Sequence, residues 1–346
     1  MKNNRLLYLL IIILTIWCIV LTTMSINNDS SPKEVVNEVN VTGITTDLTK
    51  IVEDKKDSLV TINASGNVGS GFIYKQDGEN IYIVTAHHIV ADANSYYVYF
   101  ANNMGMNAEL VGSNIYADLA VLKVKSPYNI DTLNLADVTL SKSGEFVVCI
   151  GTPTSVEFDA SVELGMLSNV RTIENSITVD DKNINYYIDV IQLSSNLKPG
   201  YSGAPVLNMN GEVIGMVTMN LQEGFNFAIT SNEIKIVADK LINNEQITKY
   251  QLGIKGTYIT DMPMFERSNL NLSVETINGL YVEKLLDNSI ALIAGVKTGD
   301  VIISINEVEL NSINDYLNVV YSETNSFNFV VLRDNSTITY TVNIND

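Results

Sequence analysis

Short hydrophobic runs separated by polar turns dominate the chain from about residue 55 to residue 230. The clearest runs are LVTINA, SGFIYK, NIYIVTA, YYVYFA, LAVLKV, EFVVCIG, NYYIDVIQ, EVIGMVTM and FNFAI. They are rich in β-branched and aromatic residues and are bounded by glycine, asparagine and aspartate, which is typical of strands joined by turns. Many short strands of this kind predict an all-β barrel or sandwich.

The pattern then changes to a helical one. In the segment SNEIKIVADKLINNE, the residues Ile234, Val237, Ala238 and Leu241 recur at helical spacing, and Ser231 is a candidate N-cap. From about residue 249 to residue 346, strands alternate with short helices at NSIALIAGV and near SINDYLNVVY. A segment of this length is enough for one small α+β module.

An uninterrupted apolar run, LLYLLIIILTIWCIVLTTM, occupies residues 6–24 and is about as long as a membrane-spanning helix requires. Lys2 and Arg5 precede it, so the positive-inside rule places the N-terminus in the cytoplasm. A cleaved signal peptide is the alternative, but its apolar region is normally shorter and no small-x-small cleavage site follows. We therefore predict a cytoplasmic tip and transmembrane anchor over residues 1–24, and a polar linker over residues 25–50.

Composition excludes several classes of function. The chain has 39 acidic and 21 basic residues among 346, a net charge of −18, which disfavours nucleic acid as a partner. Only Cys149 lies outside the apolar N-terminal run, so no internal disulfide is expected, and its apolar surroundings indicate a core residue. No cluster of residues resembles a metal site, and we predict neither a metal nor a cofactor.

The segment NLKPGYSGAPVLNMNGEVIGMV, residues 196–217, carries the most informative chemistry. Ser202 follows a Pro-Gly turn and leads into a strand, which places its hydroxyl on a sharply bent backbone. There the amides of Gly200 and Ser202 can converge on one point, as the oxyanion of an acyl transfer requires. Glycine suits such a turn because the backbone conformation is often costly for other residues.

A serine hydroxyl is a weak nucleophile until a base takes its proton. The only two histidines are His87 and His88, and the residues alone do not choose between them. Asp118 directly precedes the apolar strand LAVLKV and could orient an imidazole. The order His, Asp, Ser is one of the known orders of the catalytic triad. The sequence therefore predicts a serine hydrolase.

Several of these segments together resemble the HtrA family of trypsin-like serine proteases, which are double β-barrel enzymes with C-terminal PDZ domains. They are GSGFIYK, YIVTAHHIV, ADLAVLKV, IQLSSNLKPGYSGAPVLN and GFNFAITSN. The resemblance covers about residues 52–346. The family pattern Thr-x-x-His matches Thr85 to His88 and implies that His88 is the base, with His87 an ordinary, partly exposed side chain. It likewise implies that Asp118 is the orienting acid, Ser202 the nucleophile and Gly200 part of the oxyanion hole.

Two residues depart from the family pattern around the serine. Tyr201 replaces an asparagine, and Ala204 replaces a glycine. If the backbone at Ala204 needed a positive φ, its methyl group would strain the site. These departures favour one alternative from another class: a non-catalytic, membrane-anchored PDZ adaptor whose degenerate barrel binds chains without cutting them.

The resemblance also implies a substrate pocket. Asn196 and Leu197 would line it together with Phe225, Asn226 and Phe227. Asn196 stands where a trypsin-like pocket has an acid, and Leu197 implies a preference for aliphatic or small side chains. The alternative is that Leu197 and Phe227 simply fill the barrel.

The segments YQLGIKG and GLYVEKLLDNSIALIAGVKTGDVIISINEVEL resemble a PDZ domain of the HtrA type. Such a module binds a C-terminal peptide as an added strand. The amides of Leu252, Gly253 and Ile254 would receive the terminal carboxylate, and Gly253 would be small enough to let it approach. The alternative is that these three residues merely begin a strand.

These expectations define a mostly β protein, with a chymotrypsin-like double barrel over residues 51–245 and a PDZ domain over residues 249–346. We expect a bacterial serine endopeptidase, anchored in the cell membrane by one helix with both domains on the extracytoplasmic side. Misfolded or exported polypeptides are its expected substrates. C-terminal peptides are expected ligands of the PDZ domain, and the family's usual assembly implies a homotrimer.

Overall fold

The computed structural model describes residues 4–26, 42–101, 104–152, 160–179, 181–218, 225–270 and 278–344. The chain forms two compact units, Met1–Ile44 and Thr45–Asp346. The first contains helix α1 (Asn4–Ile26), where the apolar run predicted a helix. Over the residues searched, which are those that the structure describes, no helix meets the length and apolarity required to cross a membrane.

Part of the predicted linker is helical. Helix α2 (Thr42–Lys55) was not predicted, and it begins inside the range 25–50. The physical reason is that Leu48, Ile51 and Val52 lie at helical spacing and pack against the core of the second unit. Residues 27–41 lie outside the described residues.

Six strands close into the first barrel, in the order β1-β2-β3-β6-β5-β4. Their bounds are β1 (Leu59–Ala64), β2 (Asn67–Asp77), β3 (Asn80–Ala86), β4 (Tyr96–Phe100), β5 (Gly105–Asn114) and β6 (Leu119–Lys125). The 3₁₀ turn η1 (Lys56–Ser58) precedes them, and the short helix α3 (His87–Val90) follows β3. Every neighbouring pair is antiparallel, so closure leaves no unpaired strand at an edge.

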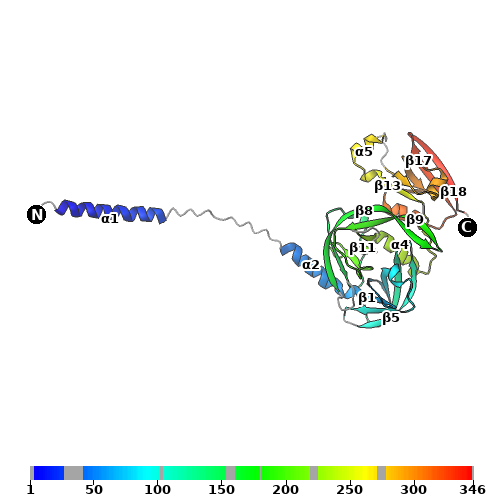
Figure 1. Ribbon diagram of the computed structural model, residues 1–346, viewed down its shortest axis with the longest axis horizontal. Coiled ribbons are helices and arrows are strands. Elements are labelled where there is room, and N and C mark those ends of the chain that lie inside the picture. The colour runs from blue at the N-terminus through cyan, green and yellow to red at the C-terminus, as the bar shows by residue number, and fades with distance from the viewer. Residues whose placement is uncertain are drawn as a thin grey trace. The chain divides into compact units, whose positions relative to one another are not determined.

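Six further strands close into the second barrel, in the order β10-β11-β12-β9-β8-β7. Their bounds are β7 (Phe146–Gly151), β8 (Ser161–Val179), β9 (Lys182–Leu193), β10 (Pro205–Leu207), β11 (Val213–Val217) and β12 (Asn226–Thr230), with the 3₁₀ turn η2 (Val138–Leu140) before β7. Figure 1 labels β1 and β5 in the first barrel and β8, β9 and β11 in the second. Cys149 is fully buried on β7, as predicted for a core residue.

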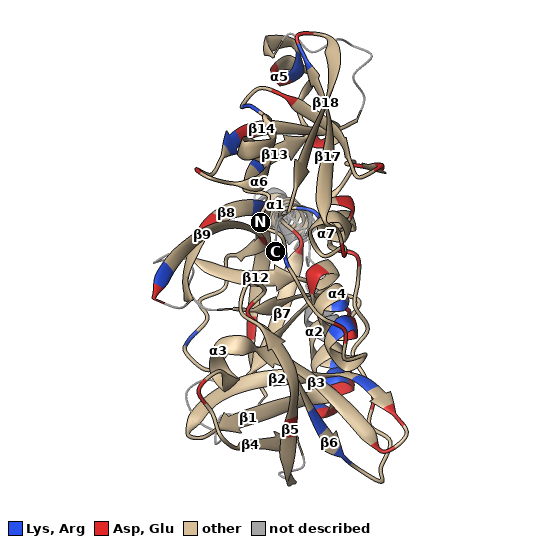
Figure 2. Cartoon of the chain, turned by 90° about the vertical axis from the view of Figure 1, so that its right-hand side faces the viewer, with Lys and Arg blue, Asp and Glu red and all other residues tan. Residues whose placement is uncertain are grey.

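Helix α4 (Ser231–Ile242) follows the last barrel strand. Its N-cap is Thr230, whose side chain accepts a hydrogen bond from the Glu233 amide, so the prediction of Ser231 as the cap was wrong by one residue. Both residues have a hydroxyl, so residue type does not choose between them, whereas the extended backbone and the hydrogen bond from Glu233 mark Thr230 as the cap. The four predicted apolar positions of α4 are buried. Figure 2 shows charged residues along α4, whereas the barrel strands are largely uncharged.

The C-terminal module is an open sheet with helices. The path of the sheet is β13-β14-β15-β17-β18, and β16 pairs with β15. Its strands are β13 (Ile254–Tyr258), β14 (Leu280–Leu285), β15 (Val301–Ile305), β16 (Val308–Glu309), β17 (Ser326–Arg333) and β18 (Ser336–Asn343). The two predicted helices are present as α6 (Ile290–Ala294) and α7 (Ile313–Val320), and η4 (Ile259–Asp261) and α5 (Met264–Asn269) were not predicted.

Candidate active site

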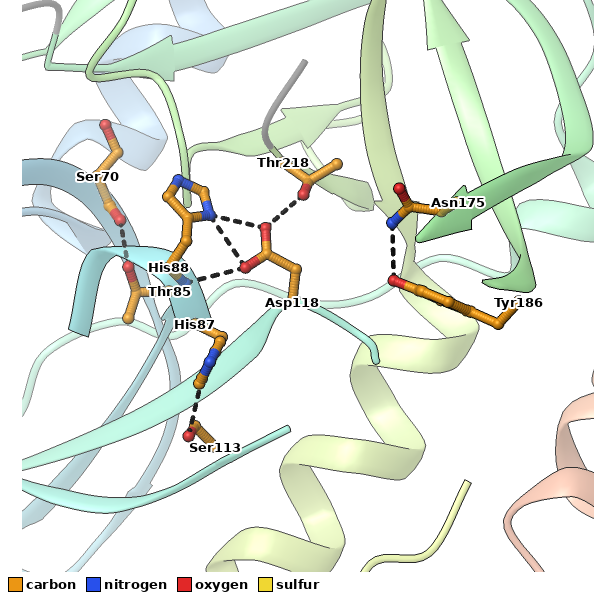
Figure 3. A network of polar contacts seen from close by, with 9 residues as sticks. All are labelled: Ser70, Thr85, His87, His88, Ser113, Asp118, Asn175, Tyr186 and Thr218. Atoms are coloured by element: carbon orange, nitrogen blue, oxygen red, sulfur yellow. Dashed lines mark hydrogen bonds and ion pairs between the residues drawn. The ribbon is translucent and has the colours of Figure 1, made fainter. Parts of the chain in front are cut away.

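His88 contacts Asp118 at the end of the first barrel. The chain leaves β3 at Ala86 and turns directly into α3, so His88 stands at the rim of the barrel. Its Nδ1 lies 2.8 Å from Oδ2 and 3.0 Å from Oδ1 of Asp118 (Figure 3). A carboxylate only accepts hydrogen bonds, so Nδ1 holds the ring proton and Nε2 is left as the basic nitrogen.

Asp118 is fixed from three sides. Its Oδ1 accepts the backbone amide of His88 at 3.0 Å, and its carbonyl accepts the amide of His87 at 3.0 Å. Thr218, directly after β11 of the second barrel, donates its hydroxyl to Oδ2. Burial alone would raise the pKa of Asp118, but the hydrogen bonds from His88 and Thr218 outweigh it and hold the pKa below its ordinary value of 3.8. The carboxylate is therefore charged at neutral pH.

Sequence reasoning missed Thr218. The only signal was a hydroxyl residue at the end of the apolar run EVIGMVTM, in a strand where every other side chain is apolar or charged. Its partner lies 100 positions earlier, so nothing local in the sequence links the two residues.

The neighbouring histidine has a different partner. Nδ1 of His87 lies 3.0 Å from the Ser113 hydroxyl on β5, and Figure 3 shows its ring directed away from Asp118. Burial lowers the pKa of His87 below its ordinary value of 6.5, so the ring is neutral at pH 7. Among the described residues, the His88 side chain contacts a carboxylate and the His87 side chain does not.

The turn that carries Ser202, residues 199–204, joins β9 to β10. Its bends are made by Gly200 at φ +100° and Gly203 at φ +86°, both in the region that favours glycine. The amide of Tyr201 donates to the Lys198 carbonyl, and the amides of residues 203 and 204 also have backbone acceptors. Among the described residues, none accepts the amides of Gly200 or Ser202. These two amides are the pair predicted to form the oxyanion hole, and they remain available for that role.

Tyr201 and Ala204 fit the turn without strain. Ala204 is fully buried and its φ is not positive, so the condition under which its methyl group would strain the backbone is not met. The positive φ values fall on the two glycines instead. The Tyr201 side chain is 2% exposed and packs beside Gly151, and burial raises its pKa to about 12. Tyr201 is therefore a neutral packing residue.

Ser202 is held close to the strand that leads to His88. Its carbonyl accepts the amide of Ser70 at 2.8 Å. A Cβ atom at Gly203 would collide with the carbonyl of Ser70 and lie 2.7 Å from the hydroxyl of Thr85, three residues before His88. Within the described part of the chain, the Ser202 hydroxyl forms no hydrogen bond and the His88 ring bonds only to Asp118. A serine–histidine bond that is long or absent without substrate often tightens in the substrate complex.

The five predicted pocket residues separate into two groups. Asn196 and Phe225 are exposed, and Asn226 donates its side-chain amide to the Ser195 carbonyl at 2.6 Å. Residues 219–224, next to Phe225, lie outside the described residues.

The other two pocket residues belong to the barrel interior. Leu197 is half-buried and packs against the main core. Phe227 is 2% exposed and lies in a small core cluster with Tyr186, Ile188 and Val190. The positions of Leu197 and Phe227 therefore agree with the alternative, in which these two side chains fill the barrel.

The predicted peptide-binding loop lies before the edge strand β13. Leu252 and Ile254 are buried, and Ile254 is the first residue of β13. Gly253 has φ +71°, and a Cβ there would collide with the Ser289 side chain. The fold itself therefore requires glycine at position 253. The predicted reason was a different one, namely space for the carboxylate of a bound peptide. The Leu252 amide already donates to the Tyr250 carbonyl at 3.2 Å, which leaves the amides of residues 253 and 254 for that role.

Comparisons with known proteins agree with this architecture. A model of the trypsin-like peptidase domain matches residues 69–216, and a PDZ domain model matches residues 241–320. The chain is 32% identical over 262 residues to the serine protease Do-like HtrA of Bacillus subtilis, covering 74% of this chain and 58% of that protein. It is 31% identical over 263 residues to the protein of the same name from Lactobacillus helveticus, covering 73% and 62%. The chain thus spans about three fifths of these relatives.

Solved structures show the same fold. The HtrA-type protease AlgW with tripeptide has a TM-score of 0.59 and 24% sequence identity, covering 85% of this chain and 95% of that chain. AlgW with decapeptide has a TM-score of 0.54 and 22% identity, covering 85% and 97%. The predicted combination of a trypsin-like double barrel and a PDZ domain is therefore confirmed.

Proposed function

Because this chain belongs to the HtrA-type family of trypsin-like, PDZ-containing serine proteases, we propose that it is a serine endopeptidase. The observation that carries the proposal is the contact between His88 and Asp118, made beside the turn that presents Ser202. The ring proton on Nδ1 leaves Nε2 free to accept a proton from a serine hydroxyl.

Each group has one task in the proposed reaction. Ser202 attacks the peptide carbonyl while His88 takes the hydroxyl proton, and the amides of Gly200 and Ser202 stabilise the oxyanion that forms. Asp118 keeps the imidazole in one tautomer and stabilises it when it becomes charged. His88 then gives its proton to the leaving amine, an acyl-enzyme remains on Ser202, and water activated by His88 hydrolyses it.

A fluorophosphonate probe tests this proposal because it labels only an activated serine. We expect stoichiometric labelling of the wild type and none of Ser202→Ala. Ser113→Ala is the matched control, since it removes a hydroxyl that contacts the other histidine, and it should label fully. A wild type that stays unlabelled even with added C-terminal peptides would favour the adaptor without activity. The unstrained Ala204 removes one argument for that adaptor.

The PDZ domain is proposed to bind C-terminal peptides by strand addition, for recruitment or regulation of the protease. What supports this is the free edge of β13, which pairs only with β14 among the described strands, and the tight loop at Gly253 before it. A fluorescent peptide with a free C-terminus should bind, and the same peptide with an amidated C-terminus should bind at least about tenfold more weakly. Equal affinities would contradict carboxylate recognition.

We further propose that residues 6–24 anchor the protein in the cell membrane, with both domains outside the cytoplasm, where misfolded or exported chains are the substrates. The length of the apolar run and the flanking Lys2 and Arg5 support this topology. Fractionation tests it: the protein should partition with membranes and retain residues 1–24. A released protein that has lost these residues would indicate a cleaved signal peptide.

A homotrimer is the proposed assembly, and an exposed apolar surface on β7 and β8 supports self-association. Phe146, Val162, Leu164 and Met166 are each 39–42% exposed, and Phe146 is paired directly with Met166. Contiguous exposed apolar side chains commonly mark interfaces. Light scattering should give three times the chain mass, and Leu164→Asp should give the monomer mass. A monomeric wild type would contradict the proposal.

A further inference from the structure

We infer that Ser70 is a positioning residue of the active site, which holds the turn of Ser202 in the shape that binds an oxyanion. The inference rests on the proposed peptidase function and names a residue outside the triad. Ser70 lies on β2 of the first barrel, is 1% exposed, and has its hydroxyl engaged within the protein by Gly200 and Thr152. Its position matters because the turn belongs to the second barrel.

Ser70 binds the turn at two carbonyl groups. Its hydroxyl donates to the carbonyl of Gly200 at 2.8 Å, and its backbone amide donates to the carbonyl of Ser202 at 2.8 Å. The peptide units after Gly200 and after Ser202 are therefore both fixed by one residue. Between them lies the peptide unit that contains the Ser202 amide, one of the two oxyanion donors.

The Gly200 bond is the one that the turn needs most. Glycine visits many backbone conformations at little cost, so its own φ of +100° does not hold the peptide planes on either side. A hydrogen bond to its carbonyl supplies that restraint. Oxyanion donors are effective because they are oriented before the charge develops. A displacement of about 1 Å in a reacting group can lower the rate about 10²-fold.

The direction of the Ser70 hydroxyl bond is set by a second contact. The backbone amide of Thr152 donates to Ser70 Oγ at 2.9 Å, which occupies a lone pair. The single hydroxyl proton is then left for the Gly200 carbonyl. The Ser70 carbonyl in turn accepts the hydroxyl of Thr85 at 2.8 Å, on the strand that ends before His88 (Figure 3). Ser70 thus connects the serine turn to the strand of the base.

A purely structural serine would give different results, and the chain offers a matched control. Ser126, just after β6, is also 1% exposed. Its hydroxyl accepts the Tyr128 amide at 3.1 Å and donates to the Tyr128 carbonyl at 3.4 Å. Ser126→Ala therefore removes the same kinds of bond from a buried serine without touching the turn. Ser70→Cys fills the space of Ser70 with a weak donor and separates packing from hydrogen bonding.

The experiment compares Ser70→Ala, Ser70→Cys and Ser126→Ala with the wild-type protein. Three quantities are measured: kcat and KM for a peptide substrate, the inhibition constant of a peptide aldehyde, and the unfolding midpoint. The aldehyde forms a tetrahedral adduct with Ser202 whose oxygen occupies the oxyanion hole. We expect both Ser70 variants to lower kcat about 10²-fold and to change KM by less than about twofold. The inhibition constant of the aldehyde should rise by a similar factor to the fall in kcat. Ser126→Ala should change neither kcat nor the inhibition constant by more than about twofold.

The outcomes separate the two proposals. An active wild type with unchanged kcat in Ser70→Ala, or full recovery in Ser70→Cys, would overturn the role of the Ser70 hydroxyl and leave the peptidase proposal standing. A wild type that neither hydrolyses peptides nor reacts with the fluorophosphonate would overturn the peptidase proposal, and with it this role of Ser70. Equal losses of kcat in Ser70→Ala and Ser126→Ala, with equal shifts in midpoint, would show a general effect of stability.

Discussion

Two glycine-containing loops of this protein are both held by hydrogen bonds to their carbonyl groups, but the donors come from different places. The serine turn, residues 199–204, is fixed by hydrogen bonds from Ser70 on the other barrel to the carbonyls of Gly200 and Ser202. The PDZ loop, residues 252–254, is fixed from within its own module. Ala291 donates its amide to the Leu252 carbonyl at 3.2 Å, and Leu286 donates to the Gly253 carbonyl at 2.9 Å. The Leu252 and Ile254 side chains are buried. Each has a glycine at positive φ, so local conformation alone does not distinguish the two.

The difference matches what each loop is proposed to do. Hydrogen bonds are directional and fix peptide units in both loops, but the serine turn depends on a contact between two barrels whereas the PDZ loop is held within one module. An oxyanion hole needs two amides aimed at one point before the reaction begins. A peptide that joins a sheet edge brings a row of its own donors and acceptors and can adjust its register. The comparison therefore predicts that small changes damage the serine turn more than the PDZ loop.

The largest effect is expected from the base that serves the serine turn. His88→Ala should lower kcat/KM at least about 10⁴-fold, because no other described group can take the Ser202 proton from that side. His87→Ala is the matched control and should lower kcat/KM less than about threefold, since His87 contacts Ser113. Peptide affinity of the PDZ domain should not change in either variant. Similar losses of kcat/KM in both variants would show that the assignment of the base is wrong.

Gly203→Ala should have the next largest effect. The added Cβ would collide with the Ser70 carbonyl, which is backbone and cannot turn away, and φ +86° adds strain. We expect fluorophosphonate labelling to slow about 10²–10³-fold while the PDZ domain binds peptide normally. Gly144→Ala, also at positive φ but with open space around it, controls for backbone strain alone and should label at nearly the wild-type rate.

Gly253→Ala is the counterpart in the PDZ loop, and its effect should be smaller. The new Cβ would collide with the Cβ of Ser289, so the loop must shift, but a bound peptide can adjust to a shifted edge strand more easily than an oxyanion can to a displaced amide. Strain of about 1–3 kcal/mol corresponds to a loss of peptide affinity of roughly 5- to 150-fold. Fluorescence anisotropy with a C-terminal peptide measures the affinity, and the rate of fluorophosphonate labelling without peptide should stay unchanged. A loss of labelling equal to that of Gly203→Ala would erase the distinction between the two loops.

The smallest effect concerns stability and pH. The folded protein holds the pKa of Asp118 below its ordinary value of 3.8, so the ionised carboxylate stabilises the fold above that value. As pH falls through the ordinary pKa toward the lower folded pKa, the unfolded chain takes up the proton first and this stabilisation is lost. Asp118→Asn should lower the free energy of unfolding on the order of 1 kcal/mol at pH 7, and the difference from wild type should shrink near pH 3. Asp131→Asn, at an exposed position, should show no such difference in urea unfolding.

Much of the fold and part of the site follow from the sequence. Strands with β-branched residues between glycine and asparagine turns, and the helical spacing of Ile234, Val237 and Ala238, are local patterns, and the structure contains these elements. The contact of His88 with Asp118 was expected from the resemblance to the HtrA family, which implied His88 rather than His87. The strands and the helix could be predicted because neighbouring residues in the chain determine them.

The missed features depend on distant contacts. Ser70 is an ordinary hydroxyl residue in a strand and Thr218 is one directly after a strand, and their roles arise only when the two barrels pack together. The φ of Ala204 could not be read from its residue type, because alanine adopts several backbone conformations. The helical start of α2 was missed because its first turn is polar, and its apolar face appears only further along. Tertiary packing decides each of these cases.

Closure of the two barrels has a consequence for self-assembly at high concentration. Every described barrel strand is paired on both sides, whereas β13 and β18 each end the open sheet of the PDZ domain. An unpaired strand edge is a template on which another chain can add. Fibrous association would therefore begin at the PDZ domain, and β13, with only five residues and a bulge after Lys255, is a poor template for long stacks. The eight-residue edge of β18 is the more prone of the two to such association.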